Sequence, residues 1–328
     1  MAKKLKRKYL IGMDLGGTKL LTSLMNKDFK IIAEKKCKIE PSRGEKFFLN
    51  TVLENVQDVL DEAGLKAGSL AAVGIGSPGI IHPKKGIVLT SPNIPFLKNY
   101  PLRAKLEKHF RLPVALENDV NTGLLGEYFF GAARGYSDVV GIFMGTGIGG
   151  ALILNGRLHR GMSGAAGEVG HMIMQKNGAL CGCGQRGCLE AYAGRIAISG
   201  EAAVLAARQK AKALFREAGT EVSKIKSGVL AKSIRGGDHA VEAMLREKAG
   251  LVGIAMANIA NLLSPELIVL GGGLVEALNG MIIREAEKSM LRHGMPDIVK
   301  HVKVAAAQLK DHAIVKGAAK LAADLVWK

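Results

Sequence analysis

The sequence predicts an α/β protein of two related lobes, and three observations lead to this expectation. Residues 9–25, YLIGMDLGGTKLLTSLM, read as a strand, a glycine turn and a second strand, and residues 138–159, DVVGIFMGTGIGGALILNGRLH, repeat the pattern. Apolar runs at 70–79 and 114–121 end in glycine or polar residues, as strands do at the ligand-binding edge of an open α/β sheet. Segments with the apolar spacing of helices separate these strands. We therefore expect each lobe to present a glycine loop to a ligand.

Four helices are expected around these strands. Residues 47–64 carry apolar side chains at helical spacing and stop at Gly64, and residues 121–135 also have a helical pattern. A long helix over 240–263 leads into a strand that ends in three glycines. Residues 312–328 form a helix that can pack onto the first lobe.

The composition indicates a globular protein large enough for two domains. The chain has 328 residues, of which 48% are hydrophobic and 23% charged. No apolar run reaches the roughly 18 residues that a membrane span requires. The basic start of the chain is followed by an apolar stretch too short for a signal peptide, without a small-residue cleavage site. We expect a cytoplasmic protein without a membrane span.

The net charge of +17 suits anionic partners such as nucleotides and phosphates. The basic residues are spread along the chain, only 5% of residues are aromatic, and no base-stacking motif is present. We expect a solvated basic surface and no specific nucleic-acid binding. The basic residues among the first eight are expected to form a flexible tail.

Three of the four cysteines lie together in GHMIMQKNGALCGCGQRGCLE, residues 170–190. A disulfide needs two Cβ atoms about 4 Å apart and facing each other, which a tight C-x-C turn rarely allows. Cys181, Cys183 and Cys188 with His171 instead form a ligand set for tetrahedral structural zinc. The alternative is a glycine-rich surface loop with free thiols. Cys37, in a strand-like run, is expected to be a buried hydrophobic residue.

The glycine loops DLGGTK and GTGIGG share a physical property. Without side chains their backbone can approach a ligand closely, and successive N–H groups can bind an anion. Either loop alone could also be a simple hairpin turn. Asp14 stands at the end of an apolar strand, where burial of a carboxylate is costly without a cation or hydrogen bonds. Mg²⁺, bound directly or through water, is a suitable partner.

Asp119 is the candidate catalytic residue. It follows a predicted strand, beside polar Glu117, Asn118 and Asn121, and in a phosphoryl transfer it would accept the proton of an attacking hydroxyl. The alternative is a structural role, because Asn and Asp are preferred at helix N-caps. Asn118 could provide the cap while Asp119 provides the chemistry, and the motif leaves both interpretations open.

Taken together, these motifs resemble those of the ROK family of repressors, open reading frames and sugar kinases. The resemblance implies a two-lobed, actin-like ATPase fold of the ribonuclease H type with a small zinc loop. It implies a kinase that transfers the γ-phosphoryl group of ATP to the 6-hydroxyl of a hexose, with glucose as the expected sugar. The matching segments are DLGGTK at 14–19, GSPG at 76–79, ENDVN at 117–121, GTGIGG at 145–150, GEVGH at 167–171, CGCGQRGCLE at 181–190 and VLGGG at 269–273.

The resemblance also implies a role for individual residues. Asp119 matches the base that deprotonates the sugar, while Asn118, Glu168, His171 and Glu190 match residues that bind the sugar ring. His171 would then contact zinc with one ring nitrogen and sugar with the other. Glu168 and Glu190 also have ordinary interpretations, as a solvated loop acid and a first-turn helix acid. The nucleotide side is matched by Gly16, Gly17, Thr18 and Lys19, by Gly145, Thr146 and Gly147, and by Gly271, Gly272 and Gly273.

Several expectations accompany this hypothesis. The first lobe is expected over residues 1–118 with about 311–328, the second over 119–310 with a zinc loop at 171–190, and the assembly as a homodimer or larger homo-oligomer. Family members often carry a tryptophan shortly after an Asn-x-Pro motif, whereas here Phe96 and Leu97 follow Asn93 and Pro95. The alternative substrates are N-acetylmannosamine, N-acetylglucosamine, mannose and fructose, and polyphosphate is an alternative donor.

Two other classes of protein are weighed against the kinase. A sugar-responsive ROK repressor would need a helix-turn-helix module, and only thirteen residues precede Asp14. A zinc module that binds protein or nucleic acid would leave the glycine loops and Asp119 unexplained. We therefore favour the kinase.

Overall fold

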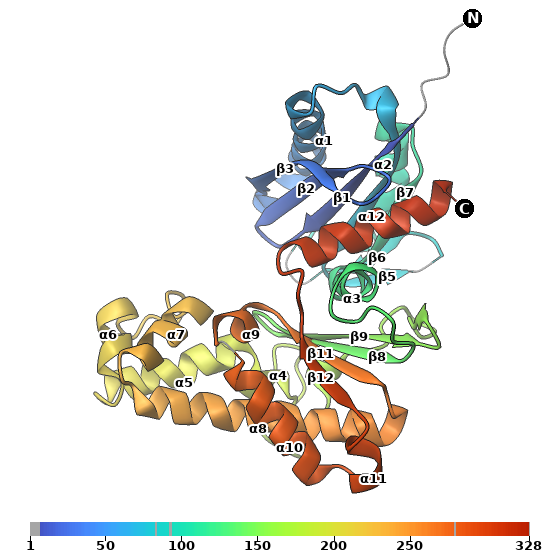
Figure 1. The fold of residues 1–328 in the computed structure, drawn as a ribbon. Coiled ribbons are helices and arrows are strands. Elements are labelled where there is room, and N and C mark those ends of the chain that lie inside the picture. Colours follow the sequence, from blue (N-terminus) through green and yellow to red (C-terminus); the bar gives the residue numbers. More distant parts are fainter. Residues whose placement is uncertain (1–6, 83, 92–93, 279, 328) are drawn as a thin grey trace, which may run out of the picture. The chain divides into compact units, whose positions relative to one another are not determined.

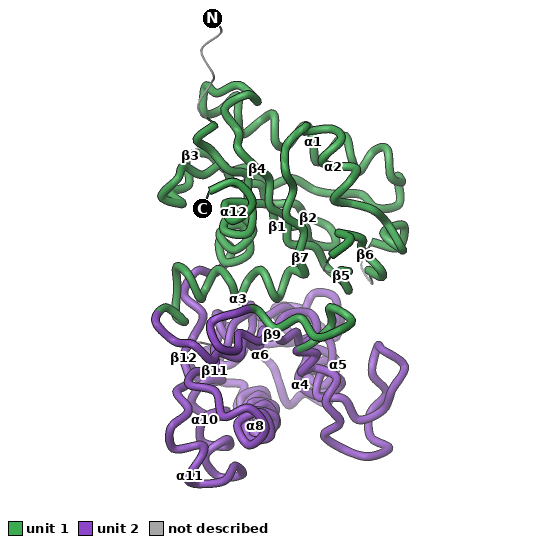
Figure 2. The backbone as a smooth tube through the Cα atoms, turned by 90° about the vertical axis from the view of Figure 1, so that its right-hand side faces the viewer, with its two compact units in different colours: residues 1–134, 158–166, 311–328 green, residues 135–157, 167–310 purple. Residues whose placement is uncertain are grey.

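The computed structural model describes residues 7–82, 84–91, 94–278 and 280–327, which form two compact units (Figures 1 and 2). The first unit contains residues 1–134, 158–166 and 311–328, and the second contains residues 135–157 and 167–310. Among the described residues, no helix combines the length and the apolar character needed to cross a membrane. The basic start of the chain, up to residue 6, and Asn93 of the Asn-x-Pro motif lie outside the described residues.

The first unit is built on a five-stranded sheet of order β3-β2-β1-β4-β7. β1 pairs antiparallel with β2 and parallel with β4, which in turn pairs parallel with β7. The strands are β1 (Tyr9–Leu15), β2 (Lys19–Met25), β3 (Ile31–Lys38), β4 (Leu70–Ser77) and β7 (Val114–Asn118), beside a separate pair, β5 (Ile80–His82) and β6 (Ile87–Thr90). The helices are α1 (Gly44–Glu62), α2 (Leu102–Phe110), α3 (Asp119–Phe130) and α12 (His312–Val326), with 3₁₀ turns η1 (Pro41–Arg43) and η2 (Ala67–Ser69).

Helices cover both faces of this sheet. Successive strand residues point to opposite sides, and apolar residues of β1 are buried on each side. Ile11 and Met13 of β1 join the core cluster beneath α1 and α2, whereas Leu10 joins a cluster with α12. Phe96 and Leu97, which stand where the ROK family often has tryptophan, belong to the α1 side. Phe96 packs edge-on against Phe48 and Tyr100, and Leu97 is fully buried. These two residues therefore serve the core.

The C-terminal helix α12 lies directly on β4 and α3 of the first unit (Figure 1). Glycines allow this approach. A Cβ atom at Gly74 of β4 would lie 1.8 Å from the carbonyl oxygen of Ala318, and one at Gly317 would lie 1.9 Å from that of Thr122. A larger residue at Gly74 would push α12 off the sheet, and one at Gly317 would push it off α3.

The second unit repeats the strand order of the first, as β10-β9-β8-β11-β12. β8 pairs antiparallel with β9 and parallel with β11, and β11 pairs parallel with β12. The predicted duplication is thereby confirmed. The strands are β8 (Val139–Met144), β9 (Ile148–Leu154), β10 (Arg157–Leu158), β11 (Leu267–Gly271) and β12 (Lys303–Ala306). The helices are α4 (Glu190–Ala193), α5 (Arg195–Ala207), α6 (Lys212–Ala218), α7 (Ser227–Arg235), α8 (His239–Leu263), α9 (Gly273–Ala277), α10 (Met281–His293) and α11 (Pro296–Val299), with a 3₁₀ turn η3 (Val169–His171).

The two units divide the chain differently from the expected lobes. Residues 119–134 were expected in the second lobe and belong to the first unit, as does the excursion 158–166. The reason for the first difference is the packing of α3 on α12, where a Cβ atom at Gly126 would lie 2.0 Å from the carbonyl oxygen of Ala313. Helix α3 and the C-terminal helix therefore belong to one packing unit.

Candidate functional site

The end of β7 carries the candidate base. Asn118 is the N-cap of α3: its Oδ1 accepts hydrogen bonds from the backbone N–H groups of Val120 at 2.9 Å and Asn121 at 3.0 Å. Asp119 is the first residue of the helix, and its Oδ1 accepts from the Val120 N–H at 2.9 Å and from Asn118 Nδ2 at 3.0 Å. These hydrogen bonds assign the N-cap to Asn118, and the role of Asp119 as a base stays a prediction. Asp119 is held at the start of α3 by its neighbours.

Glu117 precedes this pair and was not predicted to have a role of its own. Its side chain is only 6% exposed, and Arg160 Nε donates a hydrogen bond to its Oε2 at 2.5 Å. Oε1 accepts from the Asn118 N–H at 2.9 Å and from Asn121 Nδ2 at 3.0 Å. Forty-three positions separate Glu117 from Arg160, so no local pattern indicated this pair.

The first glycine loop lies between β1 and β2. The Gly16 N–H donates to the carbonyl oxygen of Lys19 at 2.8 Å, and Thr18 and Lys19 are exposed. Asp14, near the end of β1, is largely buried, and burial together with the charges of Asp119 and Asp311 raises its pKa to about 7. The negative potential around this carboxylate suits a cation.

The second glycine loop lies between β8 and β9 and is braced by side chains. The Gly145 N–H donates to the carbonyl oxygen of Gly147 at 2.9 Å. Glu190 Oε2 accepts from the Ile148 N–H at 2.9 Å, and a Cβ atom at Gly147 would lie only 2.0 Å from this oxygen. Arg195 Nη2 donates to Thr146 Oγ1 at 3.2 Å. A Cβ atom at Gly145 would meet nothing within 4 Å. The loop backbone is therefore fixed on one side and open at Gly145.

The four predicted zinc ligands converge. The ligand atoms of His171, Cys181, Cys183 and Cys188 all lie within 4.8 Å of one another. The Sγ atoms of Cys183 and Cys188 are 3.8 Å apart, which is too far for a disulfide and equals the edge of a tetrahedron with Zn–S distances of about 2.3 Å. Three thiols and one imidazole are also the donor types that structural zinc takes. The residues therefore fit a zinc ion.

The imidazole of His171 has its two nitrogens in different surroundings. Nδ1 lies 3.7 Å from Cys181 Sγ, and Nε2 lies 3.9 Å from Glu168 Oε2. The side of the ring away from the thiols thus faces a carboxylate. Glu190, at the start of α4, has Oε1 3.7 Å from Cys181 Sγ while its Oε2 holds the second glycine loop. Glu190 therefore lies in a first helical turn, as predicted. It also bridges the second glycine loop and Cys181, which the sequence did not indicate.

Two of the three glycines at the end of β11 are explained by packing. A Cβ atom at Gly271 would lie 2.7 Å from the ring of Phe143, and one at Gly272 would lie 2.6 Å from the carbonyl oxygen of Met144. Gly272 also has a φ of 88°, in the left-handed region that favours glycine. Close packing against β8 requires both residues. Gly273 begins α9 and has only Ser227 Oγ nearby, at 3.5 Å.

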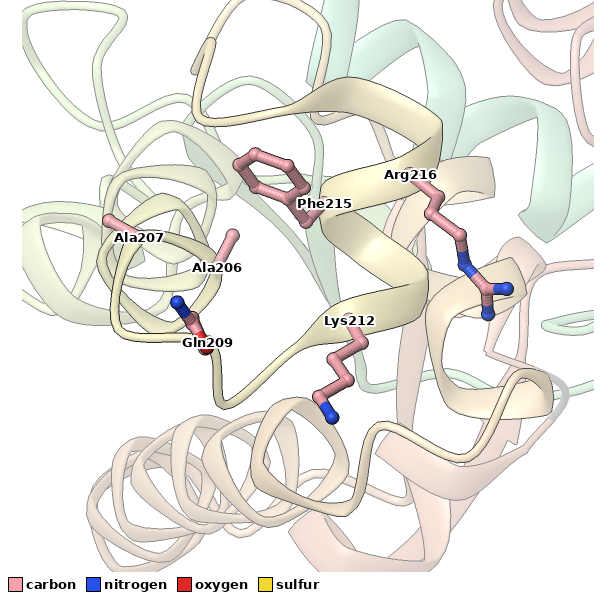
Figure 3. A pocket seen from close by; sticks show the side chains of 6 residues that line it. All are labelled: Ala206, Ala207, Gln209, Lys212, Phe215 and Arg216. Carbon is pink, nitrogen blue, oxygen red and sulfur yellow. The ribbon is translucent and has the colours of Figure 1, made fainter.

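A pocket of about 500 Å³ opens beside α5 and α6 (Figure 3). The side chains of Lys212, Phe215 and Arg216 extend from α6, and the guanidinium of Arg216 points away from the Phe215 ring. The lining residues are Ala206, Ala207, Gln209, Lys212, Phe215 and Arg216. This set contains no predicted site residue, so the pocket carries no part of the functional argument.

Comparison with known proteins identifies the family. The family model described as ROK matches residues 10–325. The chain belongs to the ROK family. The family that the motifs suggested is therefore confirmed. A likeness over almost the whole chain also covers both glycine loops, the end of β7 and the cysteine loop.

Glucokinases are among the curated relatives of high similarity. The chain is 34% identical to glucokinase from Thermotoga maritima, covering 95% of this chain and 96% of the relative. It is 35% identical to glucokinase from Streptomyces coelicolor, covering 96% and 97%. A solved structure of a ROK family glucokinase from Streptomyces griseus, in complex with glucose and AMPPNP, aligns with a TM-score of 0.83 at 33% identity, covering 96% and 99%. The fold expected from the ROK resemblance is confirmed.

Proposed function

We propose that this ROK protein is a glucokinase, an ATP-dependent kinase that transfers the γ-phosphoryl group to the 6-hydroxyl of glucose. The observation that carries the proposal is the likeness to glucokinases over nearly the full length of both chains. The likeness to a kinase structure with glucose and an ATP analogue supports the same substrate pair. The protein is therefore expected to act on small molecules.

In this proposal Asp119 is the general base. The carboxylate accepts the proton of the glucose 6-hydroxyl as the oxygen attacks the γ-phosphorus, and the bond from phosphorus to the β,γ-bridging oxygen breaks. The products are glucose 6-phosphate and ADP. The Val120 N–H and Asn118 Nδ2 hold Asp119 Oδ1, so the base is oriented before substrate binds.

The glycine loops are proposed to bind the nucleotide. Backbone N–H groups at Gly16 to Lys19 and at Gly145 to Gly147 take the phosphates, and Gly271 to Gly273 form part of the adenosine side. Asp14 would hold Mg²⁺, directly or through water, and the ion would neutralise charge on the phosphates. The buried, electronegative surroundings of Asp14 support this role.

The second unit is proposed to recognise the sugar. Glu168, His171 and Glu190, with Asn118 of the first unit, would hydrogen-bond the ring hydroxyls. Zinc held by His171 and the three cysteines would fix the direction of the imidazole, leaving Nε2 for the sugar. Zinc thus has a structural function here, and phosphoryl transfer takes place elsewhere.

A coupled assay of the purified protein tests the proposal. Glucose, mannose, fructose, N-acetylmannosamine and N-acetylglucosamine are each offered with ATP and Mg²⁺, and polyphosphate is offered as a parallel donor. We expect the highest kcat/KM for glucose with ATP. A preference for another sugar, or for polyphosphate, would contradict it. Light scattering on the same sample measures the proposed homodimer or larger assembly.

A further inference from the structure

The excursion 158–166 leaves the second unit after β10 and belongs to the first unit. Its backbone closes on itself, since the Ala166 N–H donates to the carbonyl oxygen of Arg160 at 3.1 Å. Little apolar surface anchors it: His159, Gly161, Met162 and Ser163 are exposed, Met162 completely. Hydrophobic burial of these residues therefore contributes little to holding the excursion in place.

Arg160 is the polar attachment of this excursion to the end of β7. The Arg160 side chain is 34% exposed, and its guanidinium donates to a Glu117 carboxylate whose side chain is almost completely buried. A buried carboxylate is costly unless it is paired and hydrogen-bonded, and Glu117 has the Arg160 partner on one oxygen and two N–H donors on the other. Removal of Arg160 would leave a negative charge at this position without its cation.

The other contacts of Glu117 lead to the candidate base. Its Oε1 accepts from the Asn118 N–H and from the Asn121 side chain, so the carboxylate joins the cap residue to the first turn of α3. Asn118 in turn caps α3 and donates from Nδ2 to Asp119 Oδ1. A shift of Glu117 would therefore move Asn118 and, through it, Asp119.

We propose that Arg160 is a positioning residue: its ion pair with Glu117 fixes the Asn118 cap and thereby the orientation of Asp119. The inference rests on the proposed function of Asp119 as base. Arg160 touches no reacting atom in this scheme. Its effect should appear in the rate of the chemical step, because a small misplacement of a catalytic group is costly when transfer depends on alignment.

The experiment compares Arg160→Ala, Arg160→Lys and Glu117→Gln with a matched control, Arg157→Ala, which removes an exposed arginine of β10. We expect Arg160→Ala to lower kcat by about 10- to 100-fold with little change in KM for ATP. Arg160→Lys should recover part of kcat, since the charge remains without the planar geometry. Millimolar guanidinium, below denaturing concentrations, should raise kcat of Arg160→Ala and leave Arg157→Ala unaffected.

A second measurement does not depend on activity. Hydrogen exchange of the amides of Val120 and Asn121, followed by mass spectrometry of a peptide over 117–122, reports the cap directly. We expect faster exchange in Arg160→Ala and Glu117→Gln, with no further increase in the double variant. The Arg157→Ala control should match the parent.

The outcomes separate the inference from the proposed function. If the parent phosphorylates glucose and Arg160→Ala keeps kcat within twofold, the positioning role is wrong. If the parent phosphorylates no hexose, the proposed function is wrong, and the exchange data still decide whether Arg160 fixes the cap. Unchanged exchange in Arg160→Ala would overturn the inference in either case.

Discussion

The two sheets share one strand order and differ in what their strands carry. In the first unit β7 ends in Glu117 and Asn118 and leads directly into Asp119, whereas its counterpart in the second unit, β12, is Lys303–Ala306 with two terminal alanines. The second unit instead carries the cysteine loop between β10 and α4. Duplication of a fold thus left the candidate base on one copy and the candidate metal on the other.

The two glycine loops differ in the same way. The first has exposed Thr18 and Lys19, whereas the second is braced by Glu190 at Ile148 and by Arg195 at Thr146. Because Glu190 also approaches Cys181, the second loop and the cluster share one carboxylate. A change in the cluster therefore reaches the second loop through a single side chain.

The largest effect on activity is expected at Asp119, which follows β7 of the first sheet. Asp119→Asn keeps the hydrogen bond from the Val120 N–H and removes the base, so kcat should fall by about 10²- to 10⁴-fold. Calorimetry should show glucose binding close to that of the parent. A variant with near-parent turnover would show that the two units do not differ in this way.

Loss of the metal tests the second sheet. Cys188→Ser should lose the ion and raise KM for glucose by about 10- to 100-fold, because the imidazole of His171 is no longer held. Plasma emission spectroscopy should find one zinc per parent chain, and Cys37→Ser, at a cysteine outside the cluster, should retain it. A parent protein purified without zinc, and active, would contradict the assignment.

A pair of glycine substitutions in the second loop tests the bracing. Gly147→Ala places a methyl group against Glu190 and should destabilise the unit by about 1–3 kcal/mol and weaken ATP binding. Gly145→Ala meets open space and should leave the free energy of unfolding nearly unchanged. Urea unfolding measures both. Equal losses of stability would mean that contact with Glu190 does not fix the loop.

The last effect concerns Asp14 and depends on pH. The pKa of Asp14 is about 7 in the folded protein and 3.8 for the free group. Between about pH 4 and 7 the native state therefore binds more protons than the unfolded state. Stability from this group is therefore present at low pH and lost as pH rises through 7. Asp14→Asn should exceed the parent in unfolding free energy at pH 8, by up to about 4 kcal/mol, and by less at pH 5.

Asp28→Asn, at an exposed aspartate, is the control for this pH series, and thermal unfolding without Mg²⁺ is the measurement. A constant difference between Asp14→Asn and the parent across the range would show that Asp14 keeps its ordinary pKa. Addition of Mg²⁺ and ATP to the parent should offset the loss at pH 8, if the cation binds at this carboxylate.

Much of the fold could be predicted because it depends on local sequence patterns. Apolar spacing predicts the strand, glycine turn and strand of each unit and the long helix α8. Residue type and proximity along the chain predict the four candidate zinc ligands. The sequence left the N-cap open between Asn118 and Asp119, and the hydrogen bonds from the N–H groups of Val120 and Asn121 assign it to Asn118.

The features that the sequence did not predict depend on contacts between segments far apart in the chain. The Glu117–Arg160 pair joins a strand end to an excursion, and nothing near either residue indicates the other. The same holds for Gly271 and Gly272, which we associated with a nucleotide and which packing against Phe143 and Met144 already requires. The place of α3 in the first unit likewise depends on α12, which lies at the far end of the chain.

The position of α12 has a consequence for synthesis in the cell. The first sheet is translated early, but one of its faces, with Leu10, Met25 and Ala72, packs against α12, residues 312–326. During elongation this apolar face stays open while the ribosome makes the whole of the second unit. A nascent chain should thus need protection from chaperones until the final helix emerges, and a stalled ribosome would release an aggregation-prone product.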